Sequence, residues 1–260
     1  MSGKKKSEYN VRAVERAARI LIALDGTHPE RTLSEIARAT ELPRATAYRI
    51  LVTLVNCGFV EQTADGDRYR LGFRVASLGL TALRRVSIRR DALPRMRQLV
   101  DRFQETCALG IFDQGSVLDI EVVHSNHVLT IATEVGGRLP AHCTASGKAL
   151  LAFRPPSVVE SLLEAPLKAR TKNTITTFER LHEELALVRE RGYATDEEEN
   201  ELGVRAVAAP IADSDGEVIA EISVPGPTSR LTLDRVPEIA QAVVEAANAI
   251  SAKRPRVVES

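Results

Sequence analysis

The stretch LPRATAYRILVTLVNCGFV, residues 42–60, decides the fold of the N-terminal part of the chain. Pro43 stands where the first turn of a helix tolerates proline, because the N–H group that proline lacks has no partner there. Gly58 is suited to end the helix. The pattern therefore predicts a short helix with a buried face and with hydrogen-bond donors in its first turns. The apolar residues that recur at helical spacing are Ile50, Leu51, Leu54 and Val55.

Two further helices are predicted before this one, and a hairpin is predicted after it. Residues 11–26 have an amphipathic helical pattern that ends at Gly26. Thr32 and Glu35 have the spacing of a capping box, which indicates the start of a second, short helix. After the third helix, FVEQTADGDRYRLG has strand-like ends around an Asp-Gly turn signal. This order of elements predicts a winged helix-turn-helix domain over residues 11–72.

The third helix of such a domain inserts its N-terminal side chains into the major groove of duplex DNA. Arginine can donate to guanine or phosphate, and threonine and tyrosine suit phosphate or thymine. A single arginine at a helix start is often only solvated, so the prediction depends on several donors that share one helix. Arg68 and Asp67 are expected at the hairpin tip, near the DNA backbone. The predicted DNA-binding residues are Arg44, Ala45, Thr46, Tyr48, Arg49 and Arg68.

A linker helix is expected over residues 73–90, where the helical pattern continues beyond the hairpin. A duplex site with two halves calls for a dimer, so this helix is a candidate for pairing with a second copy. An ordinary surface helix would have the same pattern. Pro94 is expected to break the helix or to start a new one. Residues 91–254 are assigned to a second domain, followed by a tail over residues 255–260.

The second domain combines strands and helices. Hairpins are predicted around Gln114-Gly115 and Asp215-Gly216, and HVLTIATEV, residues 127–135, is a further strand candidate. Helices are expected in CTASGKALLAF, behind a capping box of Thr176 and Glu179, and over residues 233–253. Antiparallel strands with helices at both ends predict an α+β fold class.

Charge is distributed unevenly along the 260 residues, although the net charge is zero. Residues 1–90 contain 17 basic and 9 acidic residues, and the rest of the chain contains 18 and 26. A basic front half suits an anionic partner such as nucleic acid, although three of its charges lie in residues 1–10, an expected disordered tail. With 4% aromatic residues and no tryptophan, base stacking on single strands is disfavoured. The expected nucleic-acid partner is double-stranded DNA.

Composition also bears on location and on metal binding. The N-terminus MSGKKKSEYN has no apolar segment typical of a secretory signal, and no apolar run reaches the roughly 18 residues of a membrane helix. We therefore expect a cytoplasmic protein with no membrane partner. Cys57, Cys107 and Cys143 form no C-x-x-C pair and are expected to be free thiols. The five histidines lack metal-ligand spacing, so no metal and no cofactor is expected.

Five motifs resemble the isocitrate-lyase-regulator (IclR) family of bacterial transcription factors. They are VERAARILIAL, LPRATAYRILVTLVNCGFV, LPAHCTASGKALLAF, RGYATDEEENELGVRAVAAPIAD and ISVPGPTSRLT. The resemblance extends from about Val11 to Lys253, and the last three motifs in this order are specific to the family. It implies a winged-helix DNA-binding domain, a linker helix and a GAF/PAS-like effector-binding domain. It also implies homodimers, commonly assembled as dimers of dimers.

The resemblance further implies an effector pocket. The loop in HCTASGKALL matches the family's ligand loop, and the other positions follow from the later motifs. At Pro225 some family members have a second serine, at Ala206 some have a cysteine, and Ser146 adds a hydroxyl where many are apolar. The acidic run over residues 196–199 is expected to be mostly a solvated loop, with Asp196 facing inward. The implied effector-binding residues are Ala145, Ser146, Asp196, Val204, Ala206 and Ser223.

The residues of TASGK give a physical reason for an anionic ligand. Thr144 can cap the following helix, and free N–H groups at a helix start suit a carboxylate. The small residues Ala145, Ser146 and Gly147 allow a ligand to approach closely. We therefore expect a small organic acid or a related metabolite as the effector, although a plainly capped helix with small packing residues would have the same pattern.

The combined prediction is a regulator, a repressor more than an activator, that binds a pseudo-palindromic operator and controls a catabolic operon. One alternative is a small-molecule-binding enzyme with a vestigial DNA-binding domain, for which His142, Cys143 and Ser146 are neighbouring candidates. No G-x-S-x-G elbow is present and no acid partner is placed, so no catalytic residue is predicted. A second alternative is a structural DNA-binding protein that ignores ligands.

Overall fold

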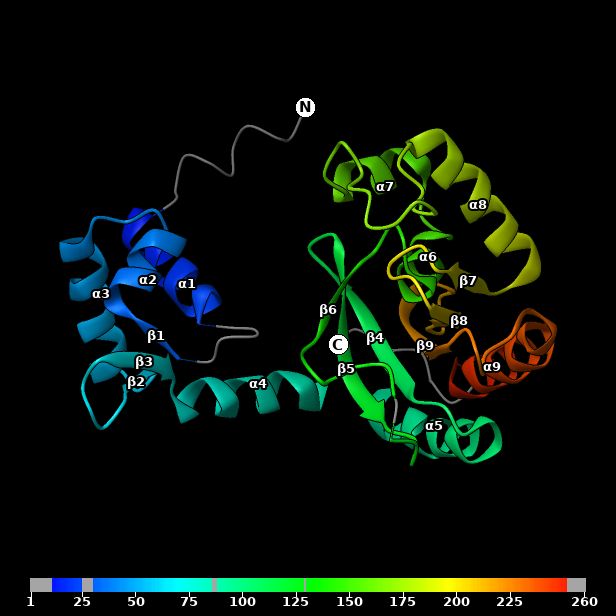
Figure 1. Ribbon diagram of the computed structural model, residues 1–260, viewed down its shortest axis with the longest axis horizontal. Coiled ribbons are helices and arrows are strands. Elements are labelled where there is room, and N and C mark those ends of the chain that lie inside the picture. Colours follow the sequence, from blue (N-terminus) through cyan, green and yellow to red (C-terminus); the bar gives the residue numbers. More distant parts are fainter. Residues whose placement is uncertain (1–10, 25–29, 86–87, 129, 252–260) are drawn as a thin grey trace. The chain divides into compact units, whose positions relative to one another are not determined.

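The chain folds into two compact units, Met1–Val86 and Ser87–Ser260, which Figure 1 shows. The tails expected over residues 1–10 and 255–260, and the helix end expected at Gly26, lie outside the described residues. Within the described part of the chain, no helix is both long and apolar enough to span a membrane. The computed structural model describes residues 11–24, 30–85, 88–128 and 130–251.

The N-terminal unit is a winged helix-turn-helix domain, as predicted. Its three strands form an antiparallel sheet in the order β1-β3-β2, in which β1 is a short strand that the sequence did not indicate. The described elements are α1 (Arg12–Ala23), β1 (Arg31–Thr32), α2 (Leu33–Ala39), α3 (Arg44–Asn56), β2 (Val60–Gln62), β3 (Arg68–Leu71) and α4 (Phe73–Arg85).

A small apolar core holds α1, α2 and α3 together. Ile20 of α1, Ile36 of α2 and Leu51 of α3 are fully buried in one cluster. The predicted capping box is present: the Thr32 hydroxyl accepts from the Glu35 amide at 3.3 Å, and the Thr32 amide donates to Glu35 Oε2 at 2.7 Å. These contacts fix the start of α2, and the buried face of α3 leaves its opposite face outward.

The C-terminal unit is built on a six-stranded antiparallel sheet in the order β6-β5-β4-β9-β8-β7. The predicted α+β class is confirmed. Its described elements are α5 (Ile88–Phe103), β4 (Cys107–Asp113), β5 (Ser116–Val123), β6 (Arg138–Pro140), α6 (Ala145–Leu151), α7 (Pro156–Leu162), α8 (Phe178–Arg191), β7 (Ala194–Glu197), β8 (Val204–Ala212), β9 (Val218–Pro227), the 3₁₀ turn η1 (Leu233–Arg235) and α9 (Val236–Ser251).

Helices cover both faces of this sheet (Figure 1). Ala206 and Ala208 of β8 belong to the same buried cluster as Ala145 and Ala149 of α6. Because side chains alternate along a strand, the intervening Val207 points to the other face, where α9 packs on β8. We call the side that α6 covers the α6 face of the sheet.

Three local predictions are wrong. Residues 127–135 form no strand in their described part, because β6 pairs with β5 in that place, with Ser116 opposite Pro140. Pro94 lies inside α5 and does not break it. Proline removes one backbone hydrogen bond, but the helix continues because its buried face extends on both sides of Pro94. The cap of α8 is Thr177 and not Thr176: its hydroxyl accepts from the amide of Arg180 at 3.4 Å.

The segment expected as a single linker helix, residues 73–90, contains α4 and the first residues of α5. Residues 86–87 between them lie outside the described part. Helix α8 ends at Gly192, as predicted, with φ of 80°, a conformation that glycine adopts at little cost.

Candidate functional site

The first turns of α3 form an exposed, basic surface. Arg44, Ala45, Tyr48 and Arg49 are exposed, with 51% of Tyr48 accessible, and Thr46 is half-buried. Among the described residues, neither Arg44 nor Arg49 forms an ion pair, so both guanidinium groups are available to an external anion. This is the arrangement that a recognition helix requires.

The hairpin of β2 and β3 stands next to this helix in the sequence. Arg68 is exposed and opens β3, one residue past the turn at Asp67, and its Nη1 donates to the backbone oxygen of Glu30 at 3.3 Å. Arg70, by contrast, is paired with Glu30 and Glu61. Of these two arginines, Arg68 therefore keeps more freedom to contact a phosphate.

A cavity of about 180 Å³ lies on the α6 face of the sheet in the C-terminal unit. It is bordered by β4, β5, β8 and β9, by the start of α6 and by the segment over residues 131–139. All six residues implied by the family resemblance border this one cavity: Ala145, Ser146, Asp196, Val204, Ala206 and Ser223.

The start of α6 is held close to the cavity by a tight packing contact. A Cβ on Gly147 would lie 2.1 Å from the backbone oxygen of Ala141, so only glycine allows the helix to approach that strand end. Thr144 caps the helix, because its hydroxyl accepts from the Gly147 amide at 3.1 Å and donates to the Pro140 oxygen at 2.8 Å. The Ser146 and Ala145 side chains are thereby fixed at the cavity wall.

The hydroxyl of Ser146 donates to the hydroxyl of Ser223 at 3.2 Å, which links α6 to β9 inside the protein. Ala206 and Pro225 lie opposite each other on β8 and β9 and supply an apolar part of the wall. The lining of the cavity thus combines polar and charged side chains, the two serines among them, with aliphatic side chains. Such a mixture is typical of small-molecule sites.

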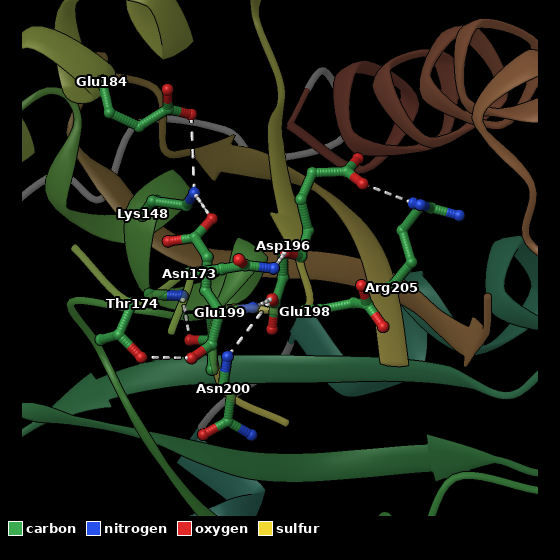
Figure 2. Close-up of polar contacts among 12 residues, drawn as sticks. Lys148, Asn173, Thr174, Glu184, Asp196, Glu198, Glu199, Asn200 and Arg205 are labelled. Carbon is green, nitrogen blue, oxygen red and sulfur yellow. Dashed lines mark hydrogen bonds and ion pairs between the residues drawn. The ribbon is translucent and has the colours of Figure 1, made fainter. Parts of the chain in front are cut away.

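A buried ion pair fixes the loop that follows β7 (Figure 2). Lys148 of α6, only 1% exposed, donates to Glu199 and also lies 3.5 Å from Glu184 of α8. The backbone oxygen of Glu199 accepts from the Thr174 hydroxyl at 2.6 Å. The expectation of a mostly solvated acidic loop is therefore wrong at this residue, because Glu199 is buried against Lys148.

Asp196 faces inward, as predicted. Its Oδ1 accepts from the amide of Glu199 at 2.8 Å and from the amide of Asn200 at 3.4 Å, so it caps the turn that carries Glu199 (Figure 2). Burial raises the pKa of Asp196 to about 7, against the opposing effect of the Glu199 amide and of Lys148. The carboxyl of Asp196 can therefore change protonation near neutral pH when a ligand enters.

The sequence prediction missed two acidic residues at the deep end of the site. Asp119 of β5 borders the cavity, and Glu221 is fully buried on β9, on the other side of β4. Burial raises the pKa of Asp119 to about 7, and burial together with Asp119 raises the pKa of Glu221 well above its usual range. The available signal was a single acid inside an otherwise apolar strand pattern, VIAEISV for Glu221.

The candidates for an enzymatic alternative are not arranged for catalysis. Burial raises the pKa of Cys143 to about 12, so its thiol is a poor nucleophile near neutral pH. The His142 ring contacts the backbone oxygen of Lys168 through Nε2 at 3.0 Å. Within the described residues, no three histidine, cysteine or acidic side chains are grouped so that they could hold a metal ion.

Comparisons with known protein families match both compact units. The family "IclR helix-turn-helix domain" matches residues 13–64, and the family "Bacterial transcriptional regulator IclR C-terminal" matches residues 80–252. Together these matches include α3 and every residue that borders the cavity.

Individual relatives are similar over nearly the full chain. The HTH-type transcriptional regulator KdgR of Escherichia coli is 36% identical, over 95% of this chain and 94% of its own. The transcriptional repressor IclR of Escherichia coli is 33% identical, over 93% and 89%. A solved IclR homolog from Microbacterium hydrocarbonoxydans, complexed with 4-hydroxybenzoate, is 31% identical with a TM-score of 0.80, and the match covers 92% of this chain and 98% of that chain.

Removal of the buried lysine tests the ion pair. We expect Lys148→Met to lower the free energy of unfolding by about 3–5 kcal/mol, because Glu199 then stays buried without its cation. The double variant Lys148→Met/Glu199→Gln should recover a large part of the loss. Chemical denaturation measures both, and the exposed Lys168→Met is the matched control. An unchanged unfolding midpoint in Lys148→Met would contradict the role given to this pair.

Replacement of Asp119 by Asn tests the raised pKa. The folded-state pKa of about 7 exceeds the ordinary value of 3.8, so the folded state binds the extra proton between these values and loses stability as pH rises through them. Relative to the wild type, Asp119→Asn should therefore become more stable as the pH rises from 5 to 8, by about 2–3 kcal/mol. Urea unfolding at the two pH values measures this gain, and a constant difference would refute it.

Proposed function

The chain belongs to the IclR family of bacterial transcriptional regulators, as its motifs predicted, and we propose that it is a repressor whose operator affinity is set by a small organic acid. The observation that carries this proposal is the convergence of six family-matched residues on one cavity, in a chain that also presents an exposed α3. The relatives are named as regulators, and one of them as a repressor. The family is one of regulators and not of enzymes.

In this proposal α3 enters the major groove of double-stranded DNA. Arg44 and Arg49 contact guanine or phosphate, Ala45, Thr46 and Tyr48 lie against the same groove, and Arg68 contacts the backbone. The exposure of four of these residues on α3, and of Arg68 at the start of β3, supports this assignment. A protein that acts on chromosomal DNA works in the bacterial cytoplasm, which is where we place it.

A pseudo-palindromic operator requires two copies of α3, about 34 Å apart along the DNA. We propose a homodimer, assembled further into a dimer of dimers. Apolar side chains that a single chain leaves exposed support pairing with a second copy: Val14 on α1 is 66% exposed, and Phe73 and Leu78 on α4 are 83% and 57% exposed.

The effector in this proposal occupies the cavity beside Ser146 and Ser223. The small residues of the wall leave room for a compact metabolite, and the relative complexed with 4-hydroxybenzoate supports an organic acid. A regulator that responds to such a compound fits the control of a catabolic operon. Ligand can change operator affinity only by its differential affinity for the two states of the protein, typically about 1–3 kcal/mol.

Charge removal on α3 tests the DNA interface. We expect Arg44→Ala and Arg49→Ala each to abolish selective binding to a duplex that the wild-type protein selects from a random pool. The salt dependence of the remaining binding should fall by about one unit of slope for each phosphate that is no longer neutralised. Gel shifts at several salt concentrations measure both effects. Arg180→Ala, an exposed arginine of the other unit, is the control, and full affinity in both α3 variants would exclude this interface.

Filling the cavity tests the effector site. A binding acid should raise the free energy of unfolding of the wild type by about 2.7 kcal/mol at a concentration 100-fold above Kd. The thermal unfolding midpoint should rise accordingly. Val204→Phe should keep DNA binding and lose this response, because Val204 borders the cavity. Val218→Phe changes an equally half-buried strand residue elsewhere and should respond normally. Thermal melts against a panel of small carboxylic acids, which includes 4-hydroxybenzoate, measure this response. An equal response in the two variants would place the ligand outside the cavity.

A further inference from the structure

The carboxyl groups of Asp119 and Glu221 approach each other beside the cavity because the residue between them, on the strand that separates β5 from β9, is a glycine. Gly110 of β4 pairs with Asp119 of β5 on one side and with Glu221 of β9 on the other. The point where a Cβ on Gly110 would lie is 2.5 Å from Glu221 Oε1 and 3.5 Å from Asp119 Oδ1. The space that a side chain at position 110 would fill is therefore occupied by the Glu221 carboxyl and by the Val117 side chain, whose Cγ1 is 2.6 Å from the same point, with Asp119 at its edge.

One oxygen of this acid pair, Asp119 Oδ1, lacks a donor among the described residues. Asp119 and Glu221 are 2% and 0% exposed. Among the described residues no group donates to Asp119 Oδ1, whereas the Glu221 carboxyl lies beside the Ser146 and Ser223 hydroxyls and the Gly110 amide. Buried acceptors without a donor are rare in folded proteins, because each loses its bonds to water without replacement. The unpartnered Asp119 Oδ1 at the cavity wall indicates a donor that comes from outside the chain.

The location of the pair connects it to the cavity. Asp119 itself borders the cavity, together with Ser146 and Ser223. Glu221 lies two residues before Ser223 on β9, so both side chains point to the α6 face. A molecule in the cavity can reach Asp119 directly and the two serine hydroxyls beside it.

We propose, on the basis of the effector role argued above, that the ligand of this cavity carries a hydroxyl group at the end that faces Asp119, so that the site selects hydroxy acids over their unhydroxylated counterparts. The ligand hydroxyl donates to Asp119 and accepts from the Ser146 hydroxyl or from the protonated carboxyl of Glu221. Asp119 is thus a specificity-determining residue, and Glu221 and Gly110 position it.

A neutral hydroxyl fits this end better than a charged group. Burial keeps a proton on the Asp119–Glu221 pair near neutral pH, so the pair offers both a donor and an acceptor. A hydroxyl matches both functions without a net charge. A second carboxylate would meet two acids, and an ammonium group would have to displace the proton and bring its own charge into a buried site.

Matched series of acids test this selectivity in the full-length protein. The probes are propionate, 3-hydroxypropionate and 3-aminopropionate; butyrate, 4-hydroxybutyrate and 4-aminobutyrate; and benzoate, 4-hydroxybenzoate and 4-(aminomethyl)benzoate. Isothermal titration calorimetry measures each Kd. We expect the hydroxy acid to bind at least tenfold more tightly than the parent acid in one series or more, and more tightly than the amino acid of that series.

Variants at the acid pair assign the selectivity to Asp119. Asp119→Leu should lose the preference while it retains affinity for the parent acid, and Asp119→Asn, which keeps an acceptor, should retain part of the preference. Asp101→Leu, the same substitution at an exposed position of α5, is the control. A preference that survives in Asp119→Leu would overturn the role of this residue.

Other outcomes separate this inference from the proposed function. Equal affinity of hydroxy and parent acids in wild-type protein would overturn the hydroxyl preference and leave the organic-acid effector in place. Tighter binding of the amino acids would overturn the hydroxyl preference and indicate that the site prefers a cationic group. Failure of every probe to bind would overturn both the hydroxyl preference and the organic-acid effector.

Discussion

The candidate site depends on one buried ion pair, between Lys148 of α6 and Glu199 of the loop after β7 (Figure 2). A lysine that is 1% exposed is costly unless a carboxylate compensates it, and Glu199 supplies that carboxylate where α6 packs against the loop. Asp196 caps the same loop through the Glu199 amide and borders the cavity together with Ser146. The wall of the cavity is therefore positioned by electrostatics in the interior as much as by apolar packing.

The two compact units differ in where they place their polar residues. In the N-terminal unit the apolar residues of α3 pack into the core, which leaves Arg44 and Arg49 exposed. In the C-terminal unit polar residues are buried on the α6 face, around a space that a metabolite can occupy. An exposed basic helix and an enclosed polar cavity together are what a ligand-controlled DNA-binding protein needs.

Local signals in the sequence predicted the features that depend on neighbouring residues. The capping box of Thr32 and Glu35, the hairpins and the end of α8 at Gly192 are confirmed, because each is determined within a few residues. The six cavity residues were inferred from resemblance, and the structure places them together. The pairing of Asp119 with Glu221 was not predictable in this way, because it depends on the order β5-β4-β9, which joins distant segments. The strand expected over residues 127–135 failed for the same reason, since the edge of β5 pairs with β6.

The absence of a side chain at Gly110 has a consequence for the divergence of related regulators. Any larger residue at this position would displace the Glu221 carboxyl, and a shorter or apolar residue at position 221 would leave a void beside the glycine. Positions 110 and 221 are therefore expected to covary during evolution, so that a larger residue at position 110 accompanies an apolar residue at position 221. Exchange of this pair can change the chemistry beside the cavity while α3 stays unchanged.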